Sequence, residues 1–396
     1  MAYQTVNPYT NEVVQTFTAH SDADVEAALA AGHALYKSDW ASPANMSVRL
    51  KILAMLAEVM NARKEELARI ISIEMGKLIG ESRSEVQSCI DIAQYYADNA
   101  ARFLAPVPYP DVLGEAWVEH HPVGIILAVE PWNFPLYQLI RVVAPAIATG
   151  NPMVVKHASN VPQCALAMEK AIADAGAPAG TYRNLFITPE QVANIIADDR
   201  VQGVALTGSE KAGSIVAGQA GAKLKKATME LGGNDVFVVL DDADVVRAAK
   251  TAAGARLYNA GQVCTAAKRY IVQASVADEF TRVVIERFQA AQMGDPLDDA
   301  TTLAPMSSQR AKNDLQTQLD QAVANGAKVL CGGAAVPEQG QFFPPTLLGN
   351  IERSNPAYFE EFFGPVAQLY VVADDDAVVA LANASNYGLG GTIFSG

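Results

Sequence analysis

One cysteine of the chain, Cys264, stands in a setting that could make its thiol reactive. The four cysteines lie far apart and form no CxxC pair, which predicts reduced thiols and a cytoplasmic protein. An isolated cysteine is ordinarily a packing residue. Cys264 differs because it follows a Gly-Gln turn in NAGQVCTAAKR, ahead of a predicted strand. That position can hold the thiol in a cleft, where backbone dipoles favour the thiolate that attacks carbonyl carbons.

A glutamate between two apolar runs is a candidate general base. Glu230 stands between Met229 and Leu231, and two glycines follow. The glycines let another group approach the backbone closely, and the apolar neighbours are expected to desolvate the carboxylate in part, as suits a base. An exposed turn glutamate is an equally good interpretation of this stretch.

The segment PWNFP (131–135) could present an amide to a developing negative charge. Its two prolines restrict the backbone on both sides of Asn133, at the end of a predicted strand. A preorganised amide N–H is the group that stabilises an oxyanion. A rigid aromatic turn is the alternative interpretation.

A strand-to-helix turn at Gly208 and Ser209 could hold phosphate groups. The run VALTGSEKAG places free backbone N–H groups and a helix N-terminus at this turn. It lacks the Lys-Ser/Thr of a P-loop, and no GxGxxG occurs in the chain. On this motif alone an ordinary turn is the better interpretation.

Several other chemistries have little support. The sequence has no GxSxG, and its five histidines show no metal-ligand spacing, which argues against a serine hydrolase and predicts no metal site. The 43 acidic and 29 basic residues leave a net charge of −14, which disfavours nucleic acid and anionic membranes as partners. No apolar run is long enough to span a bilayer.

The elements that must position these residues alternate between helix and strand. Three helical stretches (21–36, 47–76 and 81–104) follow a predicted hairpin at 5–17. Short β-branched runs then alternate with helices, as in a parallel, doubly wound α/β sheet. These runs are 124–131, 151–157, 182–188, 201–209, 227–231, 235–240 and 269–273.

The length of 396 residues predicts at least two domains. We expect a dinucleotide-binding domain at 1–103 and 123–232, and a catalytic α/β domain at 233–396. The proline-rich segment 104–122 is predicted to be an extended bridging or oligomerisation excursion, with a pair of short strands.

Taken in order, PWNFP, NPMVVKHAS, TGSEKAG, MELGG, GQVC and EEFFGPV resemble the aldehyde dehydrogenase superfamily over essentially the whole chain. The KHAS and EPWNFPLYQ segments are most similar to its bacterial succinate-semialdehyde dehydrogenase branch. The resemblance implies that Cys264 is the nucleophile, Glu230 the general base and Asn133 the oxyanion donor. It further implies oxidation of an aldehyde to a carboxylic acid through a thiohemiacetal and a thioester on Cys264.

The same resemblance implies a nicotinamide cofactor, NADP or NAD. Lys156 matches the family lysine near the adenosine ribose, Trp132 the residue beside the pyrophosphate, and Gly208 and Ser209 the helix N-terminus under the phosphates. Glu361 matches the glutamate that binds the nicotinamide ribose, and Phe363 the aromatic residue next to it.

Ser159 departs from the pattern of strongly NAD-specific members, which carry a glutamate at this position. A carboxylate there would repel a 2′-phosphate, whereas a hydroxyl can donate to it. The sequence therefore predicts that NADP is accepted.

The substrate is predicted to be a short aldehyde, with succinate semialdehyde the first candidate. Arg141 and Arg269 are candidates for binding a distal carboxylate, although a packing or salt-bridge role is the better interpretation of each. The resemblance also implies a homodimer or homotetramer. Family members continue for several dozen residues past a NYGLGG-like segment, whereas this sequence ends shortly after it. A catalytically silent fragment that binds nucleotide or partner subunits is therefore the alternative function.

Overall fold

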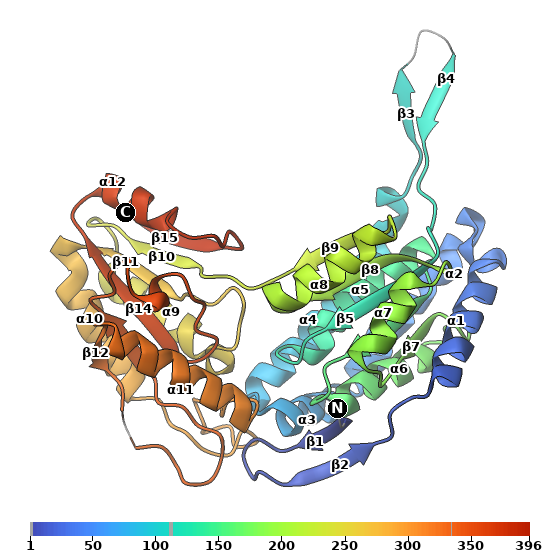
Figure 1. Cartoon of the computed structure of the whole chain (residues 1–396). Coiled ribbons are helices and arrows are strands. Elements are labelled where there is room, and N and C mark those ends of the chain that lie inside the picture. The colour runs from blue at the N-terminus through green and yellow to red at the C-terminus, as the bar shows by residue number, and fades with distance from the viewer. Residues whose placement is uncertain (1–2, 111–113, 334) are drawn as a thin grey trace. The chain divides into compact units, whose positions relative to one another are not determined.

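The chain divides into two units in the computed structural model, which describes residues 3–110, 114–333 and 335–396 (Figure 1). The first unit takes in the described parts of residues 1–5, 13–74 and 82–230. The second takes in those of residues 6–12, 75–81 and 231–396. The domain boundaries expected from the sequence stay a prediction.

The first unit is built on a parallel sheet of five strands. Their order across the sheet is β7-β6-β5-β8-β9. The strands are β5 (Ile125–Glu130), β6 (Met153–His157), β7 (Tyr182–Asn184), β8 (Val201–Thr207) and β9 (Lys226–Glu230). The chain runs outward from β5 to β7 and then returns to β8 on the other side of β5. The switch point between β5 and β8 is where such sheets bind ligands, at the carboxyl ends of the strands.

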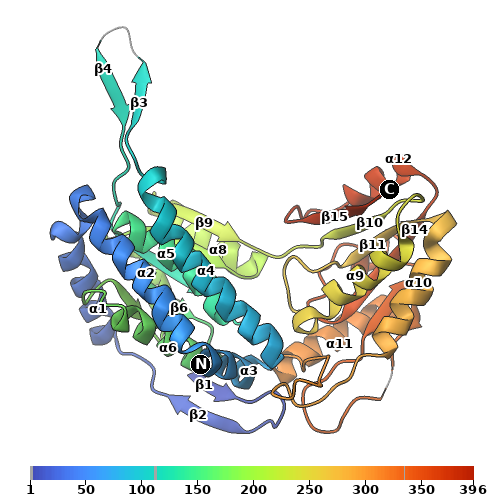
Figure 2. The ribbon, with the colours of Figure 1, turned by 180° about the vertical axis from the view of Figure 1, so that it is seen from behind.

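Helices cover both faces of this sheet. Helix α2 packs against α5 and α6, while α7 and α8 contact β8. Figure 1 shows α7 and α8 on the face of the sheet that points toward the viewer. Figure 2, seen from behind, shows α2 and α4 on the opposite face. The helices are α1 (Asp22–Tyr36), α2 (Met46–Ala62), α3 (Lys64–Met75), α4 (Ile79–Phe103), α5 (Pro135–Thr149), α6 (Pro162–Asp174), α7 (Pro189–Ala197) and α8 (Glu210–Ala222), with 3-10 turns at Asp39–Ala41 and Pro43–Asn45.

Local sequence explains where several helices begin and end. Thr188 and Gln191 form a reciprocal capping box at the start of α7, which satisfies two backbone N–H groups. Gly150 ends α5 with a φ of 89°, a conformation that glycine adopts without strain. The single helix predicted at 47–76 is wrong, because the chain leaves helical geometry at Arg63 (φ −109°, ψ 17°) and continues as α3.

Two pairs of short strands accompany this unit. Strands β1 (Tyr3–Val6) and β2 (Val13–Phe17) pair near the N-terminus, as the predicted hairpin requires. Strands β3 (Val107–Pro110) and β4 (Glu115–Val118) form the expected excursion. In Figure 1 this pair projects away from the helices of the unit.

The second unit contains a sheet of six strands in the order β12-β13-β14-β11-β10-β15. Its strands are parallel except for the antiparallel pair β12 and β13. They span β10 (Val236–Val239), β11 (Arg269–Gln273), β12 (Lys328–Cys331), β13 (Thr346–Gly349), β14 (Val366–Val372) and β15 (Gly391–Phe394). The helices are α9 (Val245–Leu257), α10 (Ala274–Gln289), α11 (Gln309–Ala324) and α12 (Asp375–Ala382), with 3-10 turns at Tyr258–Gly261 and Pro356–Tyr358.

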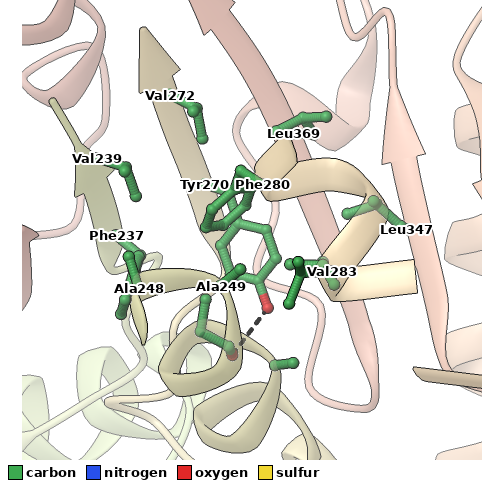
Figure 3. Close-up of a cluster of buried hydrophobic side chains, with 14 of the residues drawn as sticks. Phe237, Val239, Ala248, Ala249, Tyr270, Val272, Phe280, Val283, Leu347 and Leu369 are labelled. Carbon is green, nitrogen blue, oxygen red and sulfur yellow. Dashed lines mark hydrogen bonds between the residues drawn. The ribbon is translucent and has the colours of Figure 1, made fainter. Parts of the chain in front are cut away.

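Both faces of the central strand β11 are buried. Because side chains alternate along a strand, Tyr270 and Val272 join the core under α9 and α10 while Ile271 packs with Val378 of α12. Figure 3 shows the first of these cores, in which the Tyr270 hydroxyl donates to the Ala252 carbonyl at 2.9 Å. Burying each large apolar side chain of this kind contributes roughly 1.5–3 kcal/mol to folding. The α/β fold class expected from the sequence is confirmed.

Candidate active site

Four polar residues form a row across the carboxyl end of the first unit's sheet. His157 stands opposite Glu130 in the pairing of β6 with β5, and Thr207 stands opposite Glu230 in the pairing of β8 with β9. Val129 of β5 pairs with Leu206 of β8, so Glu130 and Thr207 are the next residues along. Residues in register on parallel strands point to the same face. The row therefore runs from Glu230 at the end of β9, through Thr207 of β8, to Glu130 of β5, the strand that leads into the Asn133 loop.

Asn133 lies in the short loop between β5 and α5 and is only 4% exposed. Glu85 of α4 holds the start of the following helix, since its carboxylate accepts the Leu136 and Tyr137 N–H groups at 2.9 and 3.1 Å. A carboxylate on free N–H groups at a helix N-terminus is a favourable pairing. The loop is thus anchored on its C-terminal side.

His157 lies between the two ends of the same loop. Its Nδ1 lies 3.1 Å from the Glu130 carbonyl oxygen and its Nε2 lies 2.9 Å from the Pro135 carbonyl oxygen. Complete burial lowers the pKa of His157 to about 4. The neutral ring carries one N–H, so it donates to one of the two carbonyls at a time.

Glu230 ends strand β9 beside Arg141 of α5. The distance from Arg141 Nη2 to Glu230 Oε2 is 3.5 Å, and Arg141 Nη1 also donates to Gln138 at 3.0 Å. The Glu230 side chain is 41% exposed, so it is less desolvated than its apolar neighbours in sequence suggested. A carboxylate of this exposure can reach a water molecule.

Glu130 is a second carboxyl in the row, and sequence inspection did not single it out. It is 3% exposed, and burial raises its pKa well above the usual range, with Glu230 acting in the same direction and Thr207 and Arg141 opposing. Burial of this kind favours the neutral acid over the carboxylate. Its position in the sequence, at the end of an apolar strand and directly before PWNFP, could have indicated that Glu130 belongs to the site.

The predicted cofactor residues of this unit lie on the loops that follow β5, β6 and β8, apart from Lys156, which lies within β6. Trp132 precedes Asn133 in the first loop, and Ser159 follows β6 with its carbonyl accepting the Gln4 N–H at 3.2 Å. Lys156 lies on β6, where its Nζ donates to the His157 carbonyl at 3.2 Å and burial lowers its pKa.

Gly208 and Ser209 connect β8 to α8. The Ser209 hydroxyl accepts the Ala212 N–H at 3.3 Å and caps the helix. The Gly208 N–H donates to the Glu230 carbonyl at 2.9 Å, which ties this turn to the end of β9. A capped helix N-terminus after a parallel strand is the arrangement that binds pyrophosphate.

Cys264 belongs to the second unit, shortly after an unusual backbone segment. Asn259, Ala260 and Gly261 have φ values of 51°, 51° and 73°, a left-handed conformation that is strained for residues with a Cβ. The Asn259 N–H donates to both carboxylate oxygens of Glu81 at 3.2 Å. A Cβ on Gly261 would collide with the Gly364 carbonyl, so the turn requires glycine there.

Several groups shift the pKa of the Cys264 thiol, and they act in opposite directions. Burial has the largest effect and raises the pKa, Glu361 acts in the same direction, and Lys268 together with nearby backbone N–H groups lowers it. The backbone N–H groups of Cys264 and Thr265 thus favour the thiolate, but the effect of burial is larger.

Glu361 and Phe363 lie in the loop between the Pro356–Tyr358 turn and β14. Glu361 Oε1 is 3.0 Å from Lys268 Nζ and accepts the Gly233 N–H at 3.3 Å. Phe363 is half-buried. Sequence inspection missed Lys268, although a lysine at the entrance to the apolar strand RYIVQ was a visible signal.

Within the described ranges, no group of three or more His, Cys, Asp or Glu side chains is placed to hold a metal ion. Of the helices that the structure describes, none has the length and apolar character needed to cross a membrane.

The whole chain, residues 1–396, matches the model of the aldehyde dehydrogenase family. The chain therefore belongs to this family. It is 45% identical over 393 residues to the succinate-semialdehyde dehydrogenase [NADP(+)] of Deinococcus radiodurans, covering 99% of this chain and 82% of that protein. It is 42% identical to a probable enzyme of the same name from Synechocystis, over 100% of this chain and 87% of that one.

Among solved structures, the chain is similar to succinic semialdehyde dehydrogenase from Streptococcus pyogenes in complex with NADP+. The TM-score is 0.97 and the sequences are 46% identical, over 100% of this chain and 86% of that one. The family resemblance predicted from the ordered motifs is confirmed.

Proposed function

We propose that this chain oxidises succinate semialdehyde to the dicarboxylic acid with NADP as cofactor. The observation that carries the proposal is the 45% identity, over nearly the whole chain, to an enzyme of that name. The alternative of a catalytically silent fragment is not favoured. A purified, folded chain that turned over no aldehyde with either NADP or NAD would instead support the silent fragment. The cytoplasmic location stays a prediction.

We further propose roles for three residues. The Cys264 thiolate adds to the aldehyde carbon and forms a thiohemiacetal, whose oxyanion accepts a hydrogen bond from the Asn133 side-chain amide. NADP, when bound, supplies the acceptor for the hydride that leaves this carbon. The thioester left on Cys264 is hydrolysed by a water whose proton Glu230 accepts, which frees the acid and the thiol.

The residues around β6 and β8 fit a phosphorylated dinucleotide. Ser209 and the N-terminus of α8 offer N–H groups to the pyrophosphate, and the half-buried Lys156 offers an ammonium near the end of β6. Ser159 offers a hydroxyl where a glutamate would repel a 2′-phosphate. These residues would hold NADP in preference to NAD.

Ser159→Glu is expected to lower kcat/KM with NADP by roughly 100-fold while that with NAD changes little, because a carboxylate at this position repels the 2′-phosphate. Initial rates with each cofactor at saturating aldehyde measure the effect. Ser159→Gln, which has the same size without the charge, is the matched control. An equal loss with both cofactors would show that the residue does not read the 2′-phosphate.

The structure separates the two arginines that could recognise a distal carboxylate. Arg269 is 2% exposed and donates to the backbone carbonyls of Asn234, Leu381 and Ala382, so it is a packing residue. Arg141 is 31% exposed and lies beside Glu230. We propose Arg141 as the residue that binds the substrate carboxylate, since a guanidinium presents five donors in a planar fork.

Arg141→Met is expected to lower kcat/KM for succinate semialdehyde by roughly 100-fold, because the variant lacks a charge-assisted hydrogen bond to the substrate. Butanal, which has no distal carboxylate, should be oxidised within a few-fold of the original rate. Arg102→Met, at an exposed arginine near the end of α4, is the matched control. An equal loss of kcat/KM with both aldehydes would instead show that Arg141 acts by positioning the Glu230 carboxylate.

We also propose a homo-oligomer, a dimer or tetramer, with the β3-β4 pair at an interface. This pair exposes large apolar side chains, with Tyr109 66% and Trp117 57% exposed. Apolar surface concentrated on a projecting hairpin is typical of a contact between chains.

A further inference from the structure

Lys268 is a buried lysine that the proposed chemistry does not use. Its side chain is 1% exposed, and it lies four residues beyond Cys264, directly before strand β11. Its Nζ donates to the Val263 carbonyl at 3.0 Å and to the Cys264 carbonyl, and it lies 3.0 Å from Glu361 Oε1. These are three acceptors for the three N–H groups of an ammonium ion. The geometry therefore suits the charged form of the lysine.

Arg256, Glu361 and Asp235, which act on the charge of Lys268, lie in the same unit as the lysine. Burial lowers its pKa most, Arg256 acts in the same direction, and Glu361 and Asp235 raise it. Glu361 is the only carboxylate among the described residues that forms an ion pair with Lys268 within 4 Å. Burying such a pair is costly unless its hydrogen bonds are complete, as they are here for the ammonium.

The same pair acts on the thiol in opposite directions. The Lys268 charge favours the Cys264 thiolate, whereas the Glu361 charge disfavours it, against the larger effect of burial. The two carbonyls that Lys268 holds belong to Cys264 itself and to the residue before it. Lys268 thus binds the backbone that carries the thiol, and its charge also favours the thiolate.

We propose that Lys268 is a positioning residue for the nucleophile, which fixes the Val263–Cys264 backbone and supplies the positive charge that makes the thiol reactive. Glu361 balances this charge, so the ion pair sets the reactivity of Cys264 at rest. The inference rests on the proposed role of Cys264, but its test does not require turnover.

Alkylation of Cys264 by iodoacetamide across a range of pH values tests the proposal, with the modified peptide followed by mass spectrometry so that Cys331 is scored separately. Lys268→Met is expected to slow alkylation of Cys264 at neutral pH by about tenfold and to move its pH profile upward. Glu361→Gln is expected to accelerate it several-fold. Lys328→Met removes an exposed lysine of β12 and should leave the profile unchanged.

An unchanged Cys264 profile in folded Lys268→Met would overturn the proposal. If that variant does not fold, Glu361→Gln decides, because a rate equal to or below that of the parent chain contradicts the charge balance. Lys268→Arg, which keeps the charge, should restore part of the reactivity; a profile like that of Lys268→Met would argue for a packing role alone. Activity retained in Cys264→Ala would refute the proposed nucleophile, whatever the Lys268 variants show.

Discussion

Cys264→Ala is expected to reduce the rate of aldehyde oxidation by at least about 10⁴-fold. Without a thiolate, the thiohemiacetal from which the hydride leaves cannot form. The measurement is NADPH formation from succinate semialdehyde by the purified variant. Binding of NADP, followed by its stabilisation of the chain against thermal unfolding, should persist, since alanine removes only the sulfur atom.

Cys331→Ala is the matched control, because Cys331 is the other partly exposed thiol of the chain. It should keep nearly full activity. If Cys264→Ala remained active while Cys331→Ala did not, the nucleophile would be reassigned to Cys331. Loss of activity in both would point to a requirement for packing around either thiol.

Glu230→Gln is expected to lower the steady-state rate by roughly 10³-fold while leaving a burst of NADPH. The reason is that Glu230 acts in the hydrolysis of the thioester and the first hydride transfer does not require it. Rapid mixing should show about one NADPH per chain, and mass spectrometry of the quenched protein should show the succinyl adduct on Cys264.

Glu58→Gln, on an exposed position of α2, serves as the neutral control and should behave like the parent chain. If the burst disappears together with steady-state turnover in Glu230→Gln, the glutamate acts before or during hydride transfer. In that case the role of base in hydrolysis must be given to another group.

Much of the fold could be predicted because local patterns carry it. The runs around Ile125–Glu130 and Val201–Thr207 are apolar and β-branched, as buried parallel strands require, and both are strands in the structure. The 182–188 run was predicted too long, since only Tyr182–Asn184 pair with β6. The break at Arg63 was missed because the apolar spacing of α2 and α3 continues across it.

The candidate site could be predicted only where a motif is contiguous. Cys264, Glu230 and Asn133 each sit in a short, distinctive string, whereas the groups that hold them do not. Glu85 reaches the start of α5 from the second turn of a different helix, and Glu81 reaches Asn259 across a long stretch of chain. Such contacts depend on tertiary packing, and nothing in the residues next to Glu85 or Glu81 indicates them.

The anchoring of the Asn133 loop by Glu85 and His157 has a consequence for protein engineering. A transplant of the PWNFP string into another scaffold would carry the amide but leave its two supports behind, because they come from a preceding helix and a neighbouring strand. The transferred asparagine would then sample many orientations. The smallest portable module here is the strand, loop and helix together with the side chains at positions 85 and 157.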